Sequence, residues 1–578
     1  MTSTARTHQH DPTRDDTEDQ IAAAEGHAAP LDLLLADAAL GPWRRFTPGM
    51  AGVRAVANAA AKPLSLVHYS TDLAGELGRI LTGRSDLAPH PKDRRFSDEL
   101  WAKNPLLKAT LQVYLAAGRS AKDLFDDIEL SWRDRERLGF LLDNVIEASA
   151  PSNLPLVNPV TWRAAASTQG RSLLAGLKNL LGDMVTAPRV PSMVDATAFS
   201  VGSDLAVSPG QVVLRTPVFE LIQYAPTTPS VRRTPLLMVP PVINKYYIVD
   251  LAPGRSMVEY LVGQGQQVFV MSWRNPDARH RNWGFDTYGE SIVEAIDAVT
   301  AITRTKQTHL MSMCSGGILA AMVAAHLSAT GAADKVATFN LGVTVLDQQD
   351  AGLPSAVLDK RVARAAISAS ARKGFLDGRS LAEIFAWLRP SDLIWSYWVN
   401  NYLQGKKPPA FDVLYWNADT TRMPAALHRD FVEMAVDNTT AHPGEGSILG
   451  TPVDLGDVDA ESYIVAGIGD HICKWQACYR STQLLGGKNT FILSTAGHIA
   501  SLVNPPTNPK SSFRTAARNP GDADQWLAEA DTENGSWWPH FADWLGERSG
   551  ATKRAPRKLG NTKFEPLEAA PGTYVFDR

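Results

Sequence analysis

Residues 308–328 read THLMSMCSGGILAAMVAAHLS and decide the fold. They begin with a short apolar stretch typical of a buried strand and end, over residues 318–328, with an alanine-rich stretch typical of a helix. Cys314 lies at the centre of the tight turn between them. Strand, turn and helix in this order are typical of a nucleophile elbow, which holds its central side chain out of the turn on strained backbone. The residues two positions either side must be small, and Ser312 and Gly316 are, so the register selects Cys314.

Two other interpretations apply to this stretch. If Ser315 were the nucleophile, Met313 would fill the small position two residues earlier and crowd the turn. We expect Ser315 to help start the helix instead. A free cysteine often only packs in the core, and short elbow patterns recur by chance. A catalytic role for Cys314 therefore depends on the partners that the rest of the chain supplies.

Those partners follow in the required order. In an α/β-hydrolase fold the acid and the histidine each lie on a loop after a late strand. Residues 462–467 read as a buried strand and lead to Asp470, the expected acid. Residues 490–493 read as another short strand and lead to His498, the expected base. A single Asp or His after a strand is usually a loop residue or a helix cap, but the ordered set favours a triad with Cys314.

The chemistry of the triad follows from the residue types. A free thiol with a pKa of about 8.5 is only slightly ionised at neutral pH, so we expect His498 to take the proton of Cys314. Asp470 would orient the imidazole and stabilise its charged form. Exchange of one thioester for another is nearly isoenergetic, so a cysteine nucleophile favours reversible loading of an acyl group from a thioester.

The oxyanion of acyl transfer needs backbone donors. The N–H of Ser315, the residue after the nucleophile, is the first one expected. The second is expected from residues 240–245, the loop behind a strand over residues 234–239. Val242 and Ile243 are the candidates, and the sequence does not choose between them.

The two other cysteines, Cys473 and Cys478, follow Asp470 on a helix-like stretch and are spaced too widely for a CxxC pair. We expect them to be packing residues, with a redox or metal role as the alternative. No cofactor or metal is expected. Three cysteines in the chain fit a reducing compartment better than a disulfide framework.

Composition narrows the class of protein. With 44% hydrophobic and 20% charged residues, the chain is globular, and its 578 residues predict two or more domains. Its 57 Lys and Arg against 61 Asp and Glu give a net charge of -4, which provides no basic excess for nucleic acid. The first thirty residues contain no signal-peptide core, and no run approaches the ~18 apolar residues of a membrane span. We expect a soluble, cytoplasmic protein or one attached peripherally.

The chain divides into three parts. Residues 1–30 are polar and charged and predict a disordered tail. Residues 31–195 predict a helical domain, because apolar residues recur at three- and four-residue spacing in segments 31–40, 71–81, 98–115, 131–149 and 164–181. Residues 196–578 predict an α/β-hydrolase catalytic domain, because strands alternate with helices.

Within the catalytic part the expected elements have short, clear patterns. They are strands over 211–215, 219–224, 267–272 and within 336–346, and helices over 287–302 and 537–547. An irregular tail is expected after the last of these helices. The first two strands are expected to be antiparallel. Residues from about 350 to 445 are mostly helix-like and dense in aromatic residues, which predicts a cap inserted over the active site. Its aromatic side chains usually form core, but as a group they also suit an acyl-binding wall or a subunit interface.

Longer motifs carry a family resemblance. The chain reads PPVINKYY over 240–247, SWRNP over 272–276, CSGG over 314–317, FDVLYWN over 411–417, DHI over 470–472 and GHI over 497–499. From Asp93 onward it resembles the polyhydroxyalkanoate synthases. Finer features resemble the class II members, which favour medium-chain monomers: CSGG at the elbow, DTTRMPAALH over 419–428 and PGTYV over 571–575. The family usually has Gly where this chain has Ser312, and the N-terminal tail is longer than in typical class II chains.

The resemblance implies polymerisation of (R)-3-hydroxyacyl-CoA into polyester with release of CoA. Cys314 would carry the growing chain as a thioester. The 3-hydroxyl of an incoming monomer, deprotonated by His498 or with help from Asp470, would attack it. The enzyme would act as a homodimer on the surface of a polyester granule, with the helical N-terminal part aiding granule contact and the cap opening to admit CoA.

Three alternatives remain at this point. One is a synthase for short-chain monomers such as 3-hydroxybutyryl-CoA. Another is a cysteine-dependent acyl-CoA thioesterase, in which water replaces the monomer hydroxyl at the same triad. The third is a granule-associated protein that keeps the fold without turnover.

Overall fold

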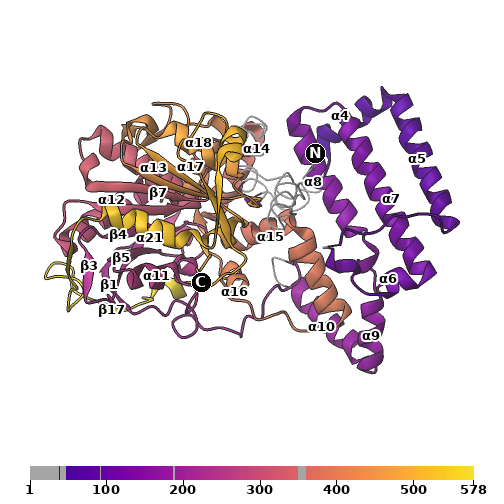
Figure 1. Cartoon of the computed structure of the whole chain (residues 1–578), viewed down its shortest axis with the longest axis horizontal. Helices are drawn as coiled ribbons and strands as arrows, with labels where there is room; N and C mark the ends of the chain where they lie inside the picture. The colour runs from indigo at the N-terminus through magenta and orange to yellow at the C-terminus, as the bar shows by residue number, and fades with distance from the viewer. Residues whose placement is uncertain (1–34, 36–37, 40–46, 92, 186–188, 349–359) are drawn as a thin grey trace, which may run out of the picture.

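The computed structural model describes residues 35, 38–39, 47–91, 93–185, 189–348 and 360–578 (Figure 1). The expected disordered tail over 1–30 lies outside the described residues. So do most of the helix expected over 31–40 and the first part of the expected cap. Within the described residues, no helix is long and apolar enough to cross a membrane.

A large mixed sheet forms the centre of residues 196–578. Among the described residues it has 11 strands in the order β15-β14-β13-β12-β7-β6-β4-β5-β2-β1-β17. The parallel strands are neighbours: β13 Asn489–Ser494, β12 Ser462–Gly467, β7 Val336–Gly342, β6 Thr308–Met313, β4 Leu236–Val239 and β5 Val268–Trp273. Antiparallel strands flank them: β14 Ser512–Thr515, β15 Asp531–Asn534, β2 Phe219–Tyr224, β1 Gly210–Arg215 and β17 Glu568–Ala569. The strands expected from apolar runs, including the antiparallel first pair, are all present.

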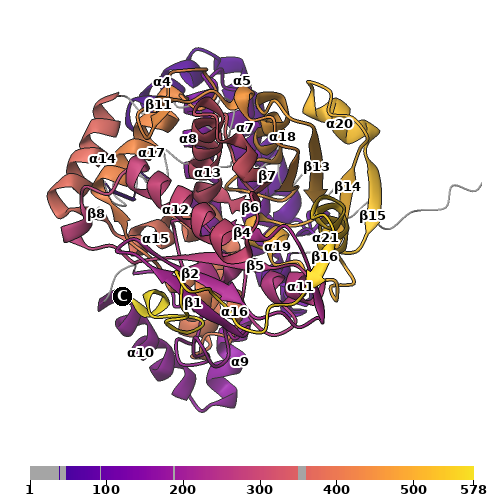
Figure 2. The ribbon, with the colours of Figure 1, turned by 90° about the vertical axis from the view of Figure 1, so that its left-hand side faces the viewer.

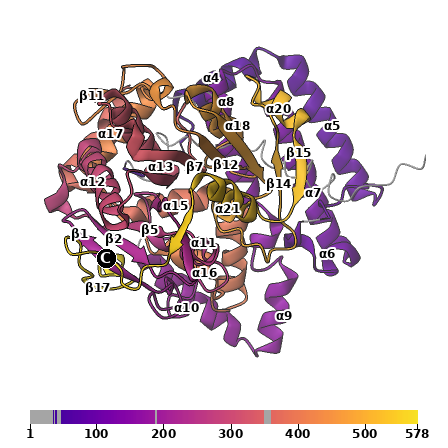
Figure 3. The same ribbon diagram turned by 60° about the vertical axis from the view of Figure 1, so that its left-hand side comes forward.

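Helices cover both faces of the sheet (Figures 2 and 3). Alternate residues of β4 show how the faces divide, because Leu237 belongs to one buried cluster and Met238 to the other. The first cluster includes side chains of α12 Phe285–Thr303, α13 Cys314–Ala329 and α18 Trp475–Leu484. The second includes side chains of α11 Met257–Gly263, α19 His498–Leu502 and α21 Trp537–Arg548. The central strands are therefore buried on both faces, which explains why their sequences are apolar runs.

The N-terminal part is helical and lies at the opposite end of the molecule from the sheet (Figure 1). Its helices are α4 Gly49–Ala60, α5 Pro63–Leu81, α6 Leu100–Lys103, α7 Pro105–Asp127, α8 Trp132–Ala148, α9 Pro159–Ser167 and α10 Arg171–Val185. The continuous helix expected over 98–115 is wrong, because the Asn104 side chain caps a new helix that begins at Pro105. The helix expected over 164–181 is also wrong, because the chain breaks at Gly170, where φ is +82°.

The segment between β7 and β12 contains the insertion that was expected to be mostly helical. Its helices are α14 Lys360–Lys373, α15 Gly378–Leu388, η7 Ser391–Trp395, η8 Trp398–Leu403, α16 Asp412–Ala418 and α17 Ala425–Asp437. Several lie between the sheet and the N-terminal helices in Figure 1.

The N-terminal helices pack directly on this insertion. A Cβ on Gly176 of α10 would lie 1.9 Å from the carbonyl oxygen of Tyr402, so the two backbones are in close contact. Asn179 donates a side-chain hydrogen bond to the carbonyl of Asn401 at 3.0 Å. The Trp398 indole donates to the carbonyl of Asn153 at 3.1 Å. The two helical segments thus meet through backbone groups as well as side chains.

The last part of the chain is more regular than expected. Residues after α21 were expected to form an irregular tail, but β17 pairs with β1 at the edge of the large sheet. The buried carboxylate of Glu220 then accepts hydrogen bonds from the N–H groups of Thr573 and Tyr574, each at 3.0 Å. This segment is therefore bound back onto the first strands of the sheet.

Candidate active site

The turn between β6 and α13 has the geometry of a nucleophile elbow. The backbone of Cys314 is in the left-handed region, with φ of +49°, where a residue other than glycine is strained. Ser312 is fully buried beneath the turn. A Cβ on Gly316 would lie 2.3 Å from the carbonyl oxygen of Pro240, so glycine is required there. These contacts explain why the residues two positions either side of Cys314 are small.

Asp470 and His498 meet at the same edge of the sheet. Asp470 lies in the loop after β12, and His498 is the first residue of α19, behind β13. The Asp470 Oδ2 to His498 Nδ1 distance is 2.7 Å. The other carboxylate oxygen, Oδ1, accepts the N–H groups of Ile472 and Cys473, each at 2.8 Å. The carboxylate is buried and both of its oxygens are occupied.

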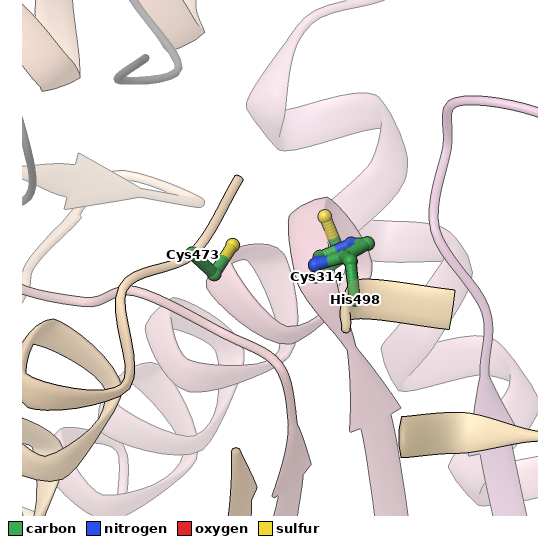
Figure 4. Close-up of side chains that lie close together, drawn as sticks. All are labelled: Cys314, Cys473 and His498. Carbon is green, nitrogen blue, oxygen red and sulfur yellow. The ribbon is translucent and has the colours of Figure 1, made fainter. Parts of the chain in front are cut away.

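The nucleophile candidate, Cys314, lies beside His498 (Figure 4). The sulfur of Cys314, the sulfur of Cys473 and a ring nitrogen of His498 all lie within 4.8 Å of one another. Because His498 Nδ1 is bonded to Asp470, Nε2 is the nitrogen free to serve the thiol. The structure therefore brings together all three residues of the expected triad, and adds a second thiol.

The electrostatics of the cluster follow from burial and charge. Burial lowers the pKa of His498, but the charge and hydrogen bond of Asp470, together with Cys314, outweigh it and raise the pKa to about 10. A hydrogen bond to Cys473 and burial raise the pKa of the Cys314 thiol well above its usual value, while His498 opposes this. A thiolate at Cys314 is thus unfavourable alone and depends on a protonated His498 beside it.

The loop expected to supply an oxyanion donor lies against the start of α13. We expected Ser315 to help start the helix as its cap, and this is wrong, because the N-cap is Met313, which makes no side-chain cap hydrogen bond. The Ser315 hydroxyl instead accepts the N–H of Val242 at 3.2 Å and so holds the loop. Asn244 has a positive φ of +67°, which turns the chain sharply after Ile243. The oxyanion roles of the Ser315 amide and of Val242 or Ile243 stay predictions.

A buried lysine fixes the far end of the same loop. The Lys245 ammonium donates to the carbonyl of Asp577 at 2.5 Å and to that of Tyr574 at 3.5 Å. The carbonyl of Lys245 accepts the indole N–H of Trp416 at 2.7 Å. The loop is therefore clamped between the insertion and the last residues of the chain.

Comparisons with known proteins agree with this geometry. A family profile described as the poly-beta-hydroxybutyrate polymerase (PhaC) N-terminus matches residues 92–261, and the profile of the α/β hydrolase fold matches residues 249–505. Poly(3-hydroxyalkanoate) polymerase 1 of Ectopseudomonas oleovorans is 45% identical, over 90% of this chain and 93% of its own. The chain belongs to the poly(3-hydroxyalkanoate) polymerase family. The expected α/β-hydrolase fold and family resemblance are both confirmed.

Two further polymerases support the same assignment. Poly(3-hydroxyalkanoate) polymerase 2 of Ectopseudomonas oleovorans is 44% identical, over 89% of this chain and 92% of its own. Poly(3-hydroxyalkanoate) polymerase subunit PhaC of Cupriavidus necator is 36% identical, over 91% of each chain. Poly(3-hydroxyalkanoate) polymerases are acyltransferases, so this chain is an enzyme of that class.

Sequence reasoning missed one residue that lies beside the expected triad. Cys473 was expected to be a packing residue, yet its thiol lies within 4.8 Å of that of Cys314. Cys478, assigned the same role, is buried in α18 and is not part of this group. The signal available in the sequence was the position of Cys473 three residues after Asp470, in the loop that must approach the nucleophile.

Proposed function

We propose that this polymerase converts (R)-3-hydroxyacyl-CoA into polyester through a covalent thioester on Cys314, with His498 as base and Asp470 as its orienting acid. The observation that carries the proposal is the group formed by the Cys314 sulfur and the Asp470-paired imidazole of His498. It lies at an elbow whose strained backbone exposes a nucleophile to substrate.

Loading starts with the thiolate of Cys314. It attacks the carbonyl carbon of the substrate thioester, and the oxyanion is stabilised by the amide of Ser315 and one amide of the loop at Val242 and Ile243. The tetrahedral intermediate collapses with cleavage of the bond to the CoA sulfur. His498, which holds the proton taken from Cys314, returns a proton to the departing CoA thiolate.

Chain growth needs a second nucleophile, which is the 3-hydroxyl of an incoming hydroxyacyl-CoA. The hydroxyl attacks the thioester on Cys314 and gives an ester one unit longer on CoA, which Cys314 then takes back with release of CoA. We assign removal of the hydroxyl proton to His498. Asp470 is buried, and its two oxygens already accept hydrogen bonds from His498 and from the amides of Ile472 and Cys473, which supports an indirect role.

We further propose a preference for medium-chain monomers, based on the class II-like segment over residues 419–428. This segment lies against the expected oxyanion loop. The Tyr247 hydroxyl donates to Asp419 at 3.1 Å, and the Thr421 hydroxyl donates to the carbonyl of Val242 at 3.4 Å. A segment in contact with that loop is well placed to influence which acyl chain fits.

The proposal includes action as a homodimer on polyester granules in the cytoplasm, with residues 31–195 as a separate helical domain that aids surface contact. The exposed apolar residues of α10 support this contact. They are Leu173, Leu174, Leu177, Leu181, Met184 and Val185, with exposed fractions from 41% to 79%. A row of apolar side chains in water is typical of a surface that meets another apolar phase. Replacing Leu174, Leu177 and Leu181 by Gln should move the enzyme off granules without abolishing CoA release.

The first experiment measures CoA release by the wild type and Cys314→Ala with 3-hydroxybutyryl-CoA and 3-hydroxyoctanoyl-CoA, and identifies the products. Polymer from the wild type only, and faster release from the octanoyl substrate, is the expected result. Faster release from the butyryl substrate would overturn the medium-chain assignment. Free hydroxy acid as the sole product would make the enzyme a thioesterase, and undiminished release in the alanine variant would exclude Cys314 as nucleophile.

A further inference from the structure

The second thiol beside the nucleophile has no part in the proposed polymerisation. Cys473 is buried, and its sulfur lies within 4.8 Å of both the Cys314 sulfur and a ring nitrogen of His498. Two thiols and one imidazole at such separations form a set of soft ligands. Figure 4 shows the side chain of Cys473 directed from its own loop toward Cys314 and His498.

The position of Cys473 is fixed by the residue that orients the histidine. Asp470 Oδ1 accepts the N–H of Cys473 at 2.8 Å, and Asp470 Oδ2 is bonded to His498 Nδ1 at 2.7 Å. The backbone N–H of Ile472 reinforces the same turn at 2.8 Å. One carboxylate therefore holds both the second thiol and the imidazole in place.

We propose that Cys314 Sγ, Cys473 Sγ and His498 Nε2 form an inhibitory binding site for a thiophilic divalent cation, with Zn²⁺ as the representative ion. Typical Zn–S and Zn–N bonds of about 2.3 and 2.0–2.1 Å place ligand atoms about 3.6–3.8 Å apart in a tetrahedron. The three atoms lie within 4.8 Å of one another, so shifts of about 1 Å complete three corners of a tetrahedron and leave the fourth for water.

Asp470 gives His498 the carboxylate partner that a metal-binding histidine usually has. A ligating imidazole commonly donates its second ring N–H to a carboxylate, which fixes the tautomer and aims the other nitrogen at the metal. His498 Nδ1 makes this contact with Asp470, so Nε2 is the nitrogen presented to the thiols. The pair that would serve catalysis is thus also oriented for coordination.

Charge balance in the buried cluster also permits a divalent cation to replace protons. Binding of one Zn²⁺ requires two thiolates and a neutral imidazole. Whether His498 starts protonated beside a thiolate or neutral beside two thiols, two protons leave as one divalent cation enters. The net charge of the cluster is unchanged, so no uncompensated charge is buried.

The consequence is reversible inhibition. A metal-bound Cys314 thiolate shares a lone pair and much of its negative charge with the ion, which weakens it as a nucleophile, and a coordinated His498 cannot accept a proton. Hard cations such as Mg²⁺ prefer oxygen ligands and should not compete for this site. The inhibition, but not the metal binding, rests on the proposed role of Cys314 as nucleophile.

The test titrates Co²⁺ into the reduced, metal-free, full-length enzyme and records thiolate-to-cobalt charge-transfer absorption. We expect one equivalent to bind to the wild type and to Cys478→Val, which changes a neighbouring buried cysteine outside the cluster. Cys314→Ala and Cys473→Val should lose the absorption. Zn²⁺ should displace Co²⁺ from the wild type and abolish its CoA release, with recovery on adding a chelator, whereas Mg²⁺ should do neither.

Each variant is compared with itself with and without Zn²⁺, so that changes in basal rate do not matter. We expect the Zn²⁺ concentration for half-inhibition to rise at least about 100-fold in Cys473→Val. If that variant fails to fold, as judged by circular dichroism, Cys473→Ser provides the same comparison. No charge-transfer absorption in the wild type, or equal absorption in the wild type and the Cys473 variants, would overturn the site. Metal binding with undiminished CoA release would instead overturn Cys314 as nucleophile.

Discussion

At the scale of single residues, the identity of the proposed nucleophile matters because its surroundings suit a thiol. Cys314 depends on His498, whose pKa is raised to about 10, to hold the proton that the thiol releases. A serine alkoxide is far harder to generate at the same place. We expect Cys314→Ser to release CoA at least about 100-fold more slowly than the wild type, with unchanged thermal unfolding. Near-wild-type release would contradict a thiolate mechanism.

The proposed role of Asp470 as the acid is tested by a substitution that keeps the shape of the side chain. In Asp470→Asn the amide oxygen can still accept the N–H groups of Ile472 and Cys473, so the loop should keep its fold. The imidazole loses the charge that raises its pKa and fixes its tautomer. We expect CoA release to fall on the order of 10³-fold, measured alongside circular dichroism. A rate equal to that of the wild type would mean that another residue is the acid.

The sequence predicted the expected triad residues but not their fourth neighbour. Cys314, Asp470 and His498 each stand behind an apolar strand, and parallel strands bring their carboxyl ends to one edge of the sheet. Cys473 carries no such signal. Its contact with Cys314 arises because the loop after Asp470 turns back, through hydrogen bonds to the carboxylate that no periodicity reveals.

At the scale of secondary-structure elements, strands were easier to predict than the helices of the N-terminal part. The strand over residues 462–467 was predicted to the residue, because a fully buried strand is a continuous apolar run, here bounded by a serine and a glycine. Helix breaks were missed where the apolar spacing continues across them. Pro105 begins α7 rather than ending a helix, and Gly170 separates α9 from α10 in a stretch whose apolar pattern barely changes.

The contact of α10 with the insertion gives a matched pair of substitutions on one helix. A Cβ at Gly176 would lie 1.9 Å from the carbonyl of Tyr402, whereas a Cβ at Gly182 would meet nothing within 4 Å. We expect Gly176→Ala to destabilise the protein by about 1–3 kcal/mol, because the backbones must separate. Gly182→Ala should stabilise it by up to about 1 kcal/mol through helix propensity. Thermal unfolding of both variants measures these two effects. Equal shifts in their unfolding temperatures would mean that α10 does not pack against Tyr402.

At the scale of the whole molecule, buried histidines make stability depend on pH. Burial lowers the pKa of His309, His428 and His471 to about 3, 4 and 4. An unfolded histidine titrates near 6.5, so between pH 6.5 and 4 the unfolded chain binds protons that the folded chain does not. As the pH is lowered through this window, the free energy of unfolding should therefore decrease, by up to about 1.4 kcal/mol per pH unit for each histidine. His498 is protonated in both states there and adds no slope.

Urea unfolding at several pH values between 6.5 and 4.5 measures this slope. His428→Gln removes one of the three groups while leaving a side chain able to bond to Ser370 and to the carbonyl of Leu35, the two partners of the imidazole. The slope of its free energy of unfolding against pH should be shallower by the contribution of about one proton, or about 1.4 kcal/mol per pH unit. Stability that does not change across the window would show that these histidines are accessible to protons in the folded enzyme.

The packing of distant segments was beyond the reach of sequence patterns. The sequence predicted a helical N-terminal part and a helical insertion, but not that the two meet through hydrogen bonds such as that from Asn179 to Asn401. Such contacts join residues more than 200 positions apart, and each side shows only a polar residue on a helix. Recognition of the family came instead from long local motifs, which need no knowledge of packing.

The clamp on the loop at Lys245 has a practical meaning for engineering. The carbonyl of Asp577 accepts a hydrogen bond from Lys245, and Glu220 accepts hydrogen bonds from Thr573 and Tyr574, so the final residues hold the loop beside Cys314 in place. A reporter or a surface anchor joined beside Asp577 would disturb these contacts, while one joined at α4 would lie in the helical part, away from the sheet (Figure 1). Immobilised or fused forms of the enzyme are therefore better attached through the helical end than through the final residues.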